Sequence, residues 1–180
     1  LFAGSTVNIY SNGTNSIPSS DKHYTDNYNR IRQVNTLLQQ ADAYEQQADI
    51  AISVGEARFF RAYCYFNLVR AFGEVPLVTF KVNDASEANV PKTTAEEIYK
   101  QIDSDLTQAE GLLPRQWQSA YLGRLTWGSA RALHARTYMM RNDWQNMYTA
   151  ATDVMNSGQY NLNTPYDVIF TDEGENSSES

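Results

Sequence analysis

Apolar residues recur at steps of three and four in the first part of the chain, which is the spacing of one face of an α-helix. These positions are Ile31, Val34, Leu38, Ala41 and Ala48. The pattern begins at Asn27 and has polar residues opposite the apolar face, so it predicts a first amphipathic helix. Residues 1–26 are rich in Ser, Asn, Gly and Thr, and we expect them to form an irregular N-terminal segment.

The second helical segment, from Ile50 to Phe72, is apolar on nearly every side. Gly73 suits the left-handed conformation that ends many helices, and Pro76 cannot continue a helix. The mean hydropathy of the whole chain is -0.54, so this segment stands apart from the rest. A helix without a polar face must be covered from several directions. We therefore expect it to lie between neighbouring helices.

A third helix is indicated by a capping signal followed by an apolar stripe. Thr93 and Thr94 each stand three residues before a glutamate, which is the capping-box pattern that begins a helix. The stripe is formed by Ile98, Ile102, Leu106, Ala109 and Leu113. We expect Gly111 and Pro114 to close this helix.

Two more helices follow the loop at residues 115–124. The fourth is expected from Thr126 to Arg141, and the fifth from Trp144 to Ser157. Asp143 is the predicted N-cap of the fifth helix, and Gly158 is expected to end it in the left-handed conformation. Beyond it, residues 167–170 have an extended pattern. The predicted fold class is all-α, with about five helices between irregular terminal segments.

Two of these helices resemble each other, which favours a repeat architecture. ARFFRAYCY, beginning at Ala57, and ARALHARTY, beginning at Ala130, share four of nine positions. Their offset of about 73 residues is close to twice the 34-residue tetratricopeptide (TPR) period. Stacked helical hairpins cover each inner helix on most sides, which would explain the apolar second helix. The alternative is chance similarity between two helices rich in Ala, Arg and Tyr.

Composition excludes several classes of protein. With 180 residues, 42% of them apolar and 19% charged, the chain fits one globular domain. A formal net charge of -7 and only 14 Lys and Arg argue against nucleic-acid binding, which needs clustered basic residues. The sequence has no membrane-spanning apolar run and no signal-peptide pattern. The single cysteine, Cys64, is expected to be a small core residue.

The sequence gives little support for catalysis or metal binding. A metal site needs several converging ligands, whereas the two histidines, His23 and His134, are far apart in the sequence. Glycine-rich phosphate loops and nucleophile elbows are absent. Asp103 and Asp105 point to different faces of the third helix, so they do not form an acid–base pair. We therefore expect no metal, no cofactor and no enzymatic activity.

Aromatic residues in or beside polar loops are the remaining candidates for a ligand site. Their rings can stack on the apolar faces of sugar rings, while neighbouring polar side chains bind the hydroxyl groups. The candidate ligand-binding residues are Tyr10, Tyr24, Tyr28, Trp117 and Tyr121. The alternative for each is a capping role, in which the ring anchors its loop on the helices.

The stretch EARFFRAYCYFNLVRAFGEVPLV, from Glu56 to Val78, resembles the signature helix of the SusD/RagB family of outer-membrane nutrient-binding lipoproteins from Bacteroidota. The segment from Gly123 to Leu162 is similar to a second family block, from which it departs at Ser129 and Met147. YNRIRQVNTLL matches a third block, with Val34 in place of Ala. The residues that best define the resemblance are Glu56, Arg58, Phe59, Arg61, Tyr65, Phe66, Gly73, Pro76, Arg124, Trp144 and Gly158.

This resemblance implies TPR-like hairpins in a lipoprotein that caps a SusC-like TonB-dependent transporter. Such a protein captures a glycan, or a peptide in the RagB branch, and delivers it to the transporter without changing it chemically. The resemblance also implies an outer-membrane, cell-surface location through a lipidated N-terminal cysteine, which this sequence lacks. Arg58 and Arg61 are expected to form hydrogen bonds between helices. A TPR-type protein–protein adaptor is the alternative from a different class.

The chain is expected to divide into an irregular segment at 1–26, a TPR-like helical domain at 27–160 and a tail at 161–180. The family has a larger C-terminal part that supplies many ligand contacts, and the tail reaches only the start of it. We therefore interpret the sequence as a fragment of a longer protein.

Overall fold

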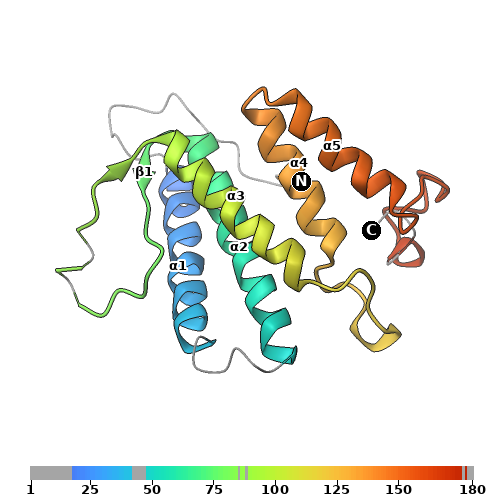
Figure 1. Cartoon of the computed structure of the whole chain (residues 1–180), viewed down its shortest axis with the longest axis horizontal. Helices are drawn as coiled ribbons and strands as arrows, with labels where there is room; N and C mark the ends of the chain where they lie inside the picture. Colours follow the sequence, from blue (N-terminus) through green and yellow to red (C-terminus); the bar gives the residue numbers. More distant parts are fainter. Residues whose placement is uncertain (1–17, 42–47, 85, 88, 176, 178–180) are drawn as a thin grey trace.

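The computed structural model describes residues 18–41, 48–84, 86–87, 89–175 and 177. These residues form five α-helices, and helices that follow one another in the chain pack side by side (Figure 1). The helices are α1 (Pro18–Ala41), α2 (Ala48–Phe72), α3 (Ala95–Leu112), α4 (Trp127–Met140) and α5 (Trp144–Asn156). The prediction of an all-α, TPR-like fold is therefore confirmed.

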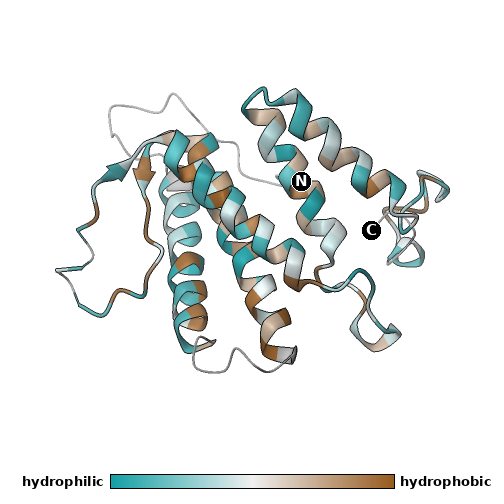
Figure 2. Ribbon diagram, in the orientation of Figure 1, coloured by the Kyte–Doolittle hydropathy of each residue, from teal (hydrophilic) through white to brown (hydrophobic). Residues whose placement is uncertain are grey.

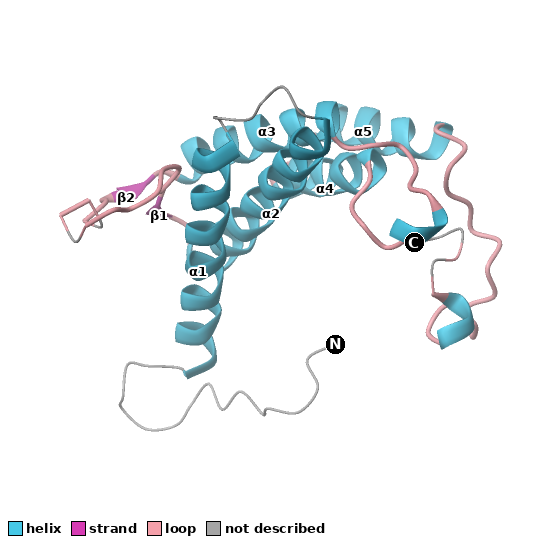
Figure 3. Cartoon of the chain, turned by 90° about the horizontal axis from the view of Figure 1, so that it is seen from below, coloured by secondary structure: helices cyan, strands magenta, loops and turns pink. Residues whose placement is uncertain are grey.

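Short irregular elements connect the helices. β1 (Val75–Pro76) and β2 (Lys92–Thr93) form an antiparallel pair that closes the loop between α2 and α3. One 3-10 turn, Ser119–Tyr121, lies between α3 and α4, and another, Asp172–Gly174, lies near the C-terminal end. The β1–β2 pair lies at one end of the molecule, and the α3–α4 loop lies with the segment after α5 at the other (Figures 1 and 3).

The predicted start of the first helix is wrong. Residues 1–26 are not irregular throughout, because α1 begins at Pro18. Proline fits the first turn of a helix, where its missing N–H needs no partner. Tyr24 and Tyr28 extend the apolar stripe of Ile31 toward the N-terminus, and their rings pack against the core. Packing thus stabilises a helical segment whose composition favours a loop. Ala48 belongs to α2 rather than to α1, which ends at residue 41.

The prediction of an extended segment at residues 167–170 is also wrong. This segment forms turns, in which the backbone N–H groups of Val168 and Ile169 donate to the carbonyl of Pro165 at 2.9 and 3.2 Å. Thr171 N–H donates to the carbonyl of Val168 at 3.0 Å. A strand needs a partner for its backbone groups, and these residues satisfy theirs locally instead.

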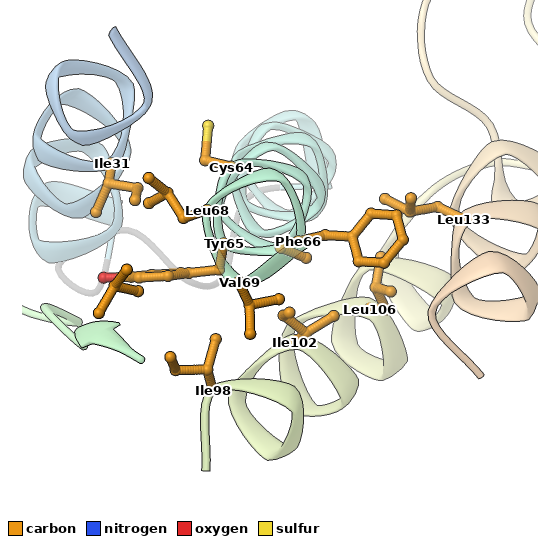
Figure 4. Close-up of a cluster of buried hydrophobic side chains, with 12 residues drawn as sticks. Ile31, Cys64, Tyr65, Phe66, Leu68, Val69, Ile98, Ile102, Leu106 and Leu133 are labelled. Carbon is orange, nitrogen blue, oxygen red and sulfur yellow. The ribbon is translucent and has the colours of Figure 1, made fainter. Parts of the chain in front are cut away.

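Helix α2 lies at the centre of the helical array, which explains its apolar sequence. It packs against α1, α3 and α4 and against β1. Its buried apolar residues are Ala57, Ala62, Cys64, Tyr65, Phe66, Leu68 and Val69. Ile31 of α1, Ile102 of α3 and Leu133 of α4 meet this helix from different sides (Figure 4). None of the described helices is both long enough and apolar enough to cross a membrane.

The apolar cover of α2 is not complete. Phe60 and Phe72 are 46% and 38% exposed, respectively. Figure 2 shows brown, hydrophobic positions along α2, with teal, hydrophilic positions between the brown ones on α1 and α3. The expected covering from several directions is confirmed, although Phe60 and Phe72 stay partly exposed.

A buried group of charged residues joins α2 to α3, and we call Arg58, Arg61 and Asp105 the Arg–Asp cluster. Arg61 donates from Nε to Asp105 Oδ2 at 2.8 Å and from Nη2 to Asp105 Oδ1 at 2.7 Å. Arg58 Nη1 donates to the same Oδ1 at 3.2 Å. Asp105 is fully buried and Arg61 is 4% exposed, so water does little to screen this bidentate ion pair.

Arg61 also connects the cluster to α1 and to the loop after β1. Its Nη1 donates to Asn35 Oδ1 at 2.9 Å and to the carbonyl of Thr79 at 3.2 Å. Asn35 Nδ2 donates to the carbonyls of Val78 and Phe80 at 2.9 and 3.0 Å. Three successive carbonyls of an irregular segment therefore find partners in buried side chains of α1 and α2.

A second charged contact joins α3 to α4 around His134, which is 2% exposed. His134 Nδ1 lies 2.7 Å from Glu110 Oε1, and Nε2 lies 3.3 Å from Asp103 Oδ1, a charge contact without hydrogen-bond geometry. Arg141 donates two hydrogen bonds of 2.8 Å to Asp103. Burial lowers the pKa of His134, but its contacts with the two carboxylates outweigh burial and hold the pKa above its ordinary value.

We predict that Asp105→Asn destabilises the chain strongly. The substitution keeps the volume of the side chain but leaves two guanidinium groups without their shared counter-ion. Breaking a buried ion pair from one side costs about 3–5 kcal/mol, so the free energy of unfolding is expected to fall by about this amount. Urea denaturation measures the change. The control is Glu96→Gln, which removes an exposed ion pair with Lys100 and should leave the midpoint unchanged. Equal losses in both variants would contradict the prediction.

We predict that the contribution of His134 to stability decreases as pH rises. Because the folded-state pKa of His134 is raised, its stabilising contribution is complete below about pH 6.5 and is lost as pH rises through the folded-state pKa. Urea titrations of the native chain and of His134→Gln between pH 5 and pH 9 measure the difference in free energy of unfolding. A difference that grows with pH would show that the sign is wrong.

Candidate functional site

A pocket of about 460 Å³ opens beside the α3–α4 loop, and we call it the Trp117 pocket. Its wall combines residues of this loop, the first turn of α4 and the segment after α5. The residues that line it are Arg115, Gln116, Trp117, Leu122, Gly123, Arg124, Leu125, Thr126, Ser129, Gln159 and Tyr160. Two loops that are distant in sequence therefore form one concave site.

Trp117 is fixed in this pocket by contacts on its edge and on its face. Its Nε1 donates to the carbonyl of Leu125 at 2.8 Å. The guanidinium carbon of Arg124 lies 4.2 Å from the centroid of the Trp117 ring. Arg124 is itself held by Glu56 of α2, to which it donates from Nε and Nη2 at 2.9 and 2.8 Å. The indole is thus positioned by a chain of contacts that ends on the central helix.

Tyr121 stands next to Trp117 on the 3-10 turn. The two ring centroids are 5.8 Å apart, and the rings are inclined at 57°. Tyr121 is 51% exposed and Leu122 is 55% exposed, so a ligand can reach both side chains. The structure therefore brings together two of the five predicted binding residues.

Another part of the pocket wall is built by residues that the sequence did not reveal as candidates. Tyr160 and Thr126 share a hydrogen bond of 2.8 Å between their hydroxyl groups. Thr126 also caps α4, because its side chain accepts from the N–H of Ser129 at 3.2 Å. Gln159 Nε2 donates to the carbonyl of Arg115 at 2.8 Å and joins the two loops. The sequence placed Thr126 at the start of the fourth helix, but no local pattern indicated its partner 34 residues later.

Tyr24 and Tyr28 lie far from this pocket. Tyr28 donates to the carbonyl of Pro76 at 2.6 Å, and Tyr24 packs edge-on against Phe72 at the C-terminal end of α2. Glu56, which holds Arg124, is 16 residues nearer the start of that helix, a distance of about 24 Å at 1.5 Å per residue. Burial is the largest cause of a raised pKa at Tyr28. These two rings fasten α1 to α2 and β1, and Tyr10 lies outside the described residues.

The remaining predicted signature residues have separate places in the fold. Gly73 and Gly158 have positive φ angles of 69° and 70° after α2 and α5, as their helix-ending role requires. Phe59 packs partly buried against the core, and Trp144 begins α5 with 56% exposure. Pro76 lies in β1, where its carbonyl receives the Tyr28 hydrogen bond.

The chemistry of the Trp117 pocket suits a neutral polar ligand with an apolar face. Trp117 offers a ring, while Thr126, Tyr160 and Gln159 offer hydroxyl and amide groups. Arg124 is paired with Glu56, so its charge is already balanced. Among the described residues, no group of three or more His, Cys, Asp or Glu side chains is arranged to hold a metal ion.

The fold and this pocket define an all-helical scaffold with a concave site, and comparison with known proteins places the scaffold in a family. Residues 5–139 match the family model of SusD-like proteins that is described as "Starch-binding associating with outer membrane". The chain therefore belongs to the SusD-like family. The curated SusD-like protein P2 of Formosa agariphila is 38% identical over 104 residues, which cover 57% of this chain and 20% of that protein.

Solved structures agree with this assignment. A laminarin-binding SusD-like protein superposes with a TM-score of 0.83 at 30% identity, over 88% of this chain and 36% of that one. A SusD-like carbohydrate-binding protein from Bacteroides fragilis superposes with a TM-score of 0.79 at 29% identity, over 87% of this chain and 31% of that one. The chain thus spans about a third or less of the length of these relatives.

We predict that Gly128→Ala disrupts the wall of the Trp117 pocket. A Cβ atom at this buried position overlaps the ring of Tyr160, which must then move away from Thr126. Overpacking of this kind costs about 1–3 kcal/mol, so the free energy of unfolding should fall by that amount. Gly111→Ala on α3 is the matched control, because nothing lies within 4 Å of its added Cβ. The control should gain about 0.5–1 kcal/mol. Urea unfolding of both variants measures these changes. A gain in stability for Gly128→Ala equal to that of Gly111→Ala would contradict the prediction.

Proposed function

We propose that this chain belongs to a glycan-capturing lipoprotein that serves a SusC-like TonB-dependent transporter at the outer membrane. It binds an oligosaccharide or polysaccharide reversibly and passes it to the transporter without breaking or forming covalent bonds. Membrane attachment is through a lipid anchor on the full-length protein. The membrane association in the family description supports the location, and the laminarin-binding relative supports the ligand class.

The observation on which the proposal depends is the arrangement of the Trp117 pocket. The Trp117 ring, which presents an apolar surface, and the hydroxyl groups of Thr126 and Tyr160 line the same pocket. A pyranose has the matching two kinds of surface, C–H faces and hydroxyl edges. Because the indole is held by Leu125 and Arg124 before any ligand arrives, little conformational entropy is lost on binding.

Each of the two arginines that line the pocket already has a partner, which favours a neutral glycan. Arg124 is neutralised by Glu56, and the guanidinium of Arg115 lies 4.0 Å from the centroid of the Trp127 ring. The formal net charge of -7 also disfavours the approach of a polyanion. A laminarin-type β-glucan is the first ligand to test.

We predict that laminarin oligosaccharides bind this chain and that Trp117→Ala weakens binding at least about tenfold, which is about 1.4 kcal/mol. Removing the indole removes the stacking surface of the pocket. Isothermal titration calorimetry measures the dissociation constants. The matched control is Trp144→Ala, because Trp144 is exposed on α5 and does not line the pocket. The control should bind as the native chain does.

Two alternatives predict different outcomes in the same experiment. A peptide-capturing member of the family would bind an oligopeptide library but not laminarin or other neutral glycans. A TPR-type adaptor would bind neither and would instead retain a partner protein. Equal loss of binding in the Trp117 and Trp144 variants would place the glycan elsewhere and overturn the assignment of this pocket.

A further inference from the structure

A second pocket, of about 450 Å³, lies between α1, α2 and the loop after β1, and we call it the Arg58 pocket. It shares no lining residue with the Trp117 pocket, and its wall has a different chemistry. The lining residues that matter for its charge and shape are Gln39, Arg58, Arg61, Phe80, Lys81 and Glu87.

The wall of this pocket has more positive than negative charge. Arg58 and Arg61 share the single carboxylate of Asp105, so one guanidinium charge of the Arg–Asp cluster is left unbalanced. Lys81, half-buried on the loop, adds a second positive charge. Glu87 is the acid among the lining residues. The wall of the pocket therefore has an excess of one positive charge, although the whole chain has a formal net charge of -7.

Of the two arginines, Arg58 is the one that is placed to bind an anion in this pocket. Arg61 donates to Asp105, Asn35 and Thr79 and is buried. The side chain of Arg58 is 22% exposed, has one bond to Asp105, and its buried Nε has no partner among the described residues. A partly desolvated guanidinium with unused donors stabilises a bound anion more than a fully hydrated surface residue does.

An apolar ring lies beside these cations. Phe80 is 45% exposed at the pocket, and the carbonyl of the same residue is fixed by Asn35 Nδ2 at 3.0 Å. Gln39 of α1 supplies an amide that can bond to hydroxyl groups. The wall thus offers cationic donors, an apolar surface and a neutral polar group within one cavity.

We propose that the Arg58 pocket binds a single carboxylate attached to a sugar ring, as in a uronate residue. The carboxylate receives hydrogen bonds from Arg58 and Lys81, the ring rests on Phe80, and Gln39 binds ring hydroxyls. A planar guanidinium fork matches a carboxylate in a bidentate manner. The excess charge of about one, together with Glu87 on the wall, disfavours multiply charged anions. This site does not depend on glycan binding in the Trp117 pocket.

The test is calorimetric titration of the chain with sodium methyl β-glucuronide, with methyl β-glucoside and sodium acetate as companion probes. The glucuronide is expected to bind at least about tenfold more tightly than the glucoside, since it alone has the charged group. Arg58→Gln and Lys81→Gln should each weaken glucuronide binding at least about tenfold. Circular dichroism checks the folding of both variants, and Lys81→Gln keeps the test valid if loss of the Asp105 contact unfolds Arg58→Gln.

Two control variants separate this site from general electrostatics and from the other pocket. Lys92→Gln removes an exposed lysine of β2 outside the pocket and should leave glucuronide affinity unchanged. Trp117→Ala should also leave it unchanged while weakening laminarin binding. If acetate binds as tightly as the glucuronide, the sugar ring has no role in binding. The ligand of the pocket would then be a small free carboxylate. Equal affinity for glucoside and glucuronide, or no effect of Lys81→Gln, would overturn the site itself.

Discussion

The two hydrogen bonds from Arg61 to the Asp105 carboxylate, of 2.8 and 2.7 Å, cross the α2–α3 interface where water is excluded. A buried carboxylate is costly unless it is fully paired, so this contact permits few alternative alignments of the two helices. Arg61 also reaches Asn35 of α1 and the carbonyl of Thr79. The same guanidinium therefore aligns three helices and shapes the irregular loop after β1.

The candidate sites depend on that alignment. The Trp117 ring is held by Arg124, which is fixed by Glu56 on α2, while the pocket itself lies on the loop between α3 and α4. The indole keeps its position only if α2, α3 and α4 keep theirs, and the contacts of His134 with Asp103 and Glu110 join the last two. Rigid helices thus preorganise a site made of loops, which lowers the conformational entropy that a ligand would lose on binding.

The arginines of the two pockets have different partners. Arg124 has its own carboxylate, Glu56, and Arg115 packs over the Trp127 ring. Arg58 shares Asp105 with Arg61 and leaves an excess of positive charge. Membership in the SusD-like family and similarity to carbohydrate-binding relatives fit both environments, since glycans contain neutral and acidic sugars. The structure therefore suggests two kinds of contact on one scaffold.

The sequence by itself determined the helices and most of their ends, because the signals are local: the Thr94 cap, the Asp143 cap and the glycine after α2 act within a few residues. It also contained a sign of the buried ion pair, since Asp105 lies on the apolar stripe of α3 between Ile102 and Ala109. Only the tertiary structure decided which arginines meet Asp105, that Tyr160 faces Thr126, and that Tyr28 supports β1 while Trp117 lines a pocket. These outcomes depend on distances between residues far apart in the chain, which local patterns do not specify.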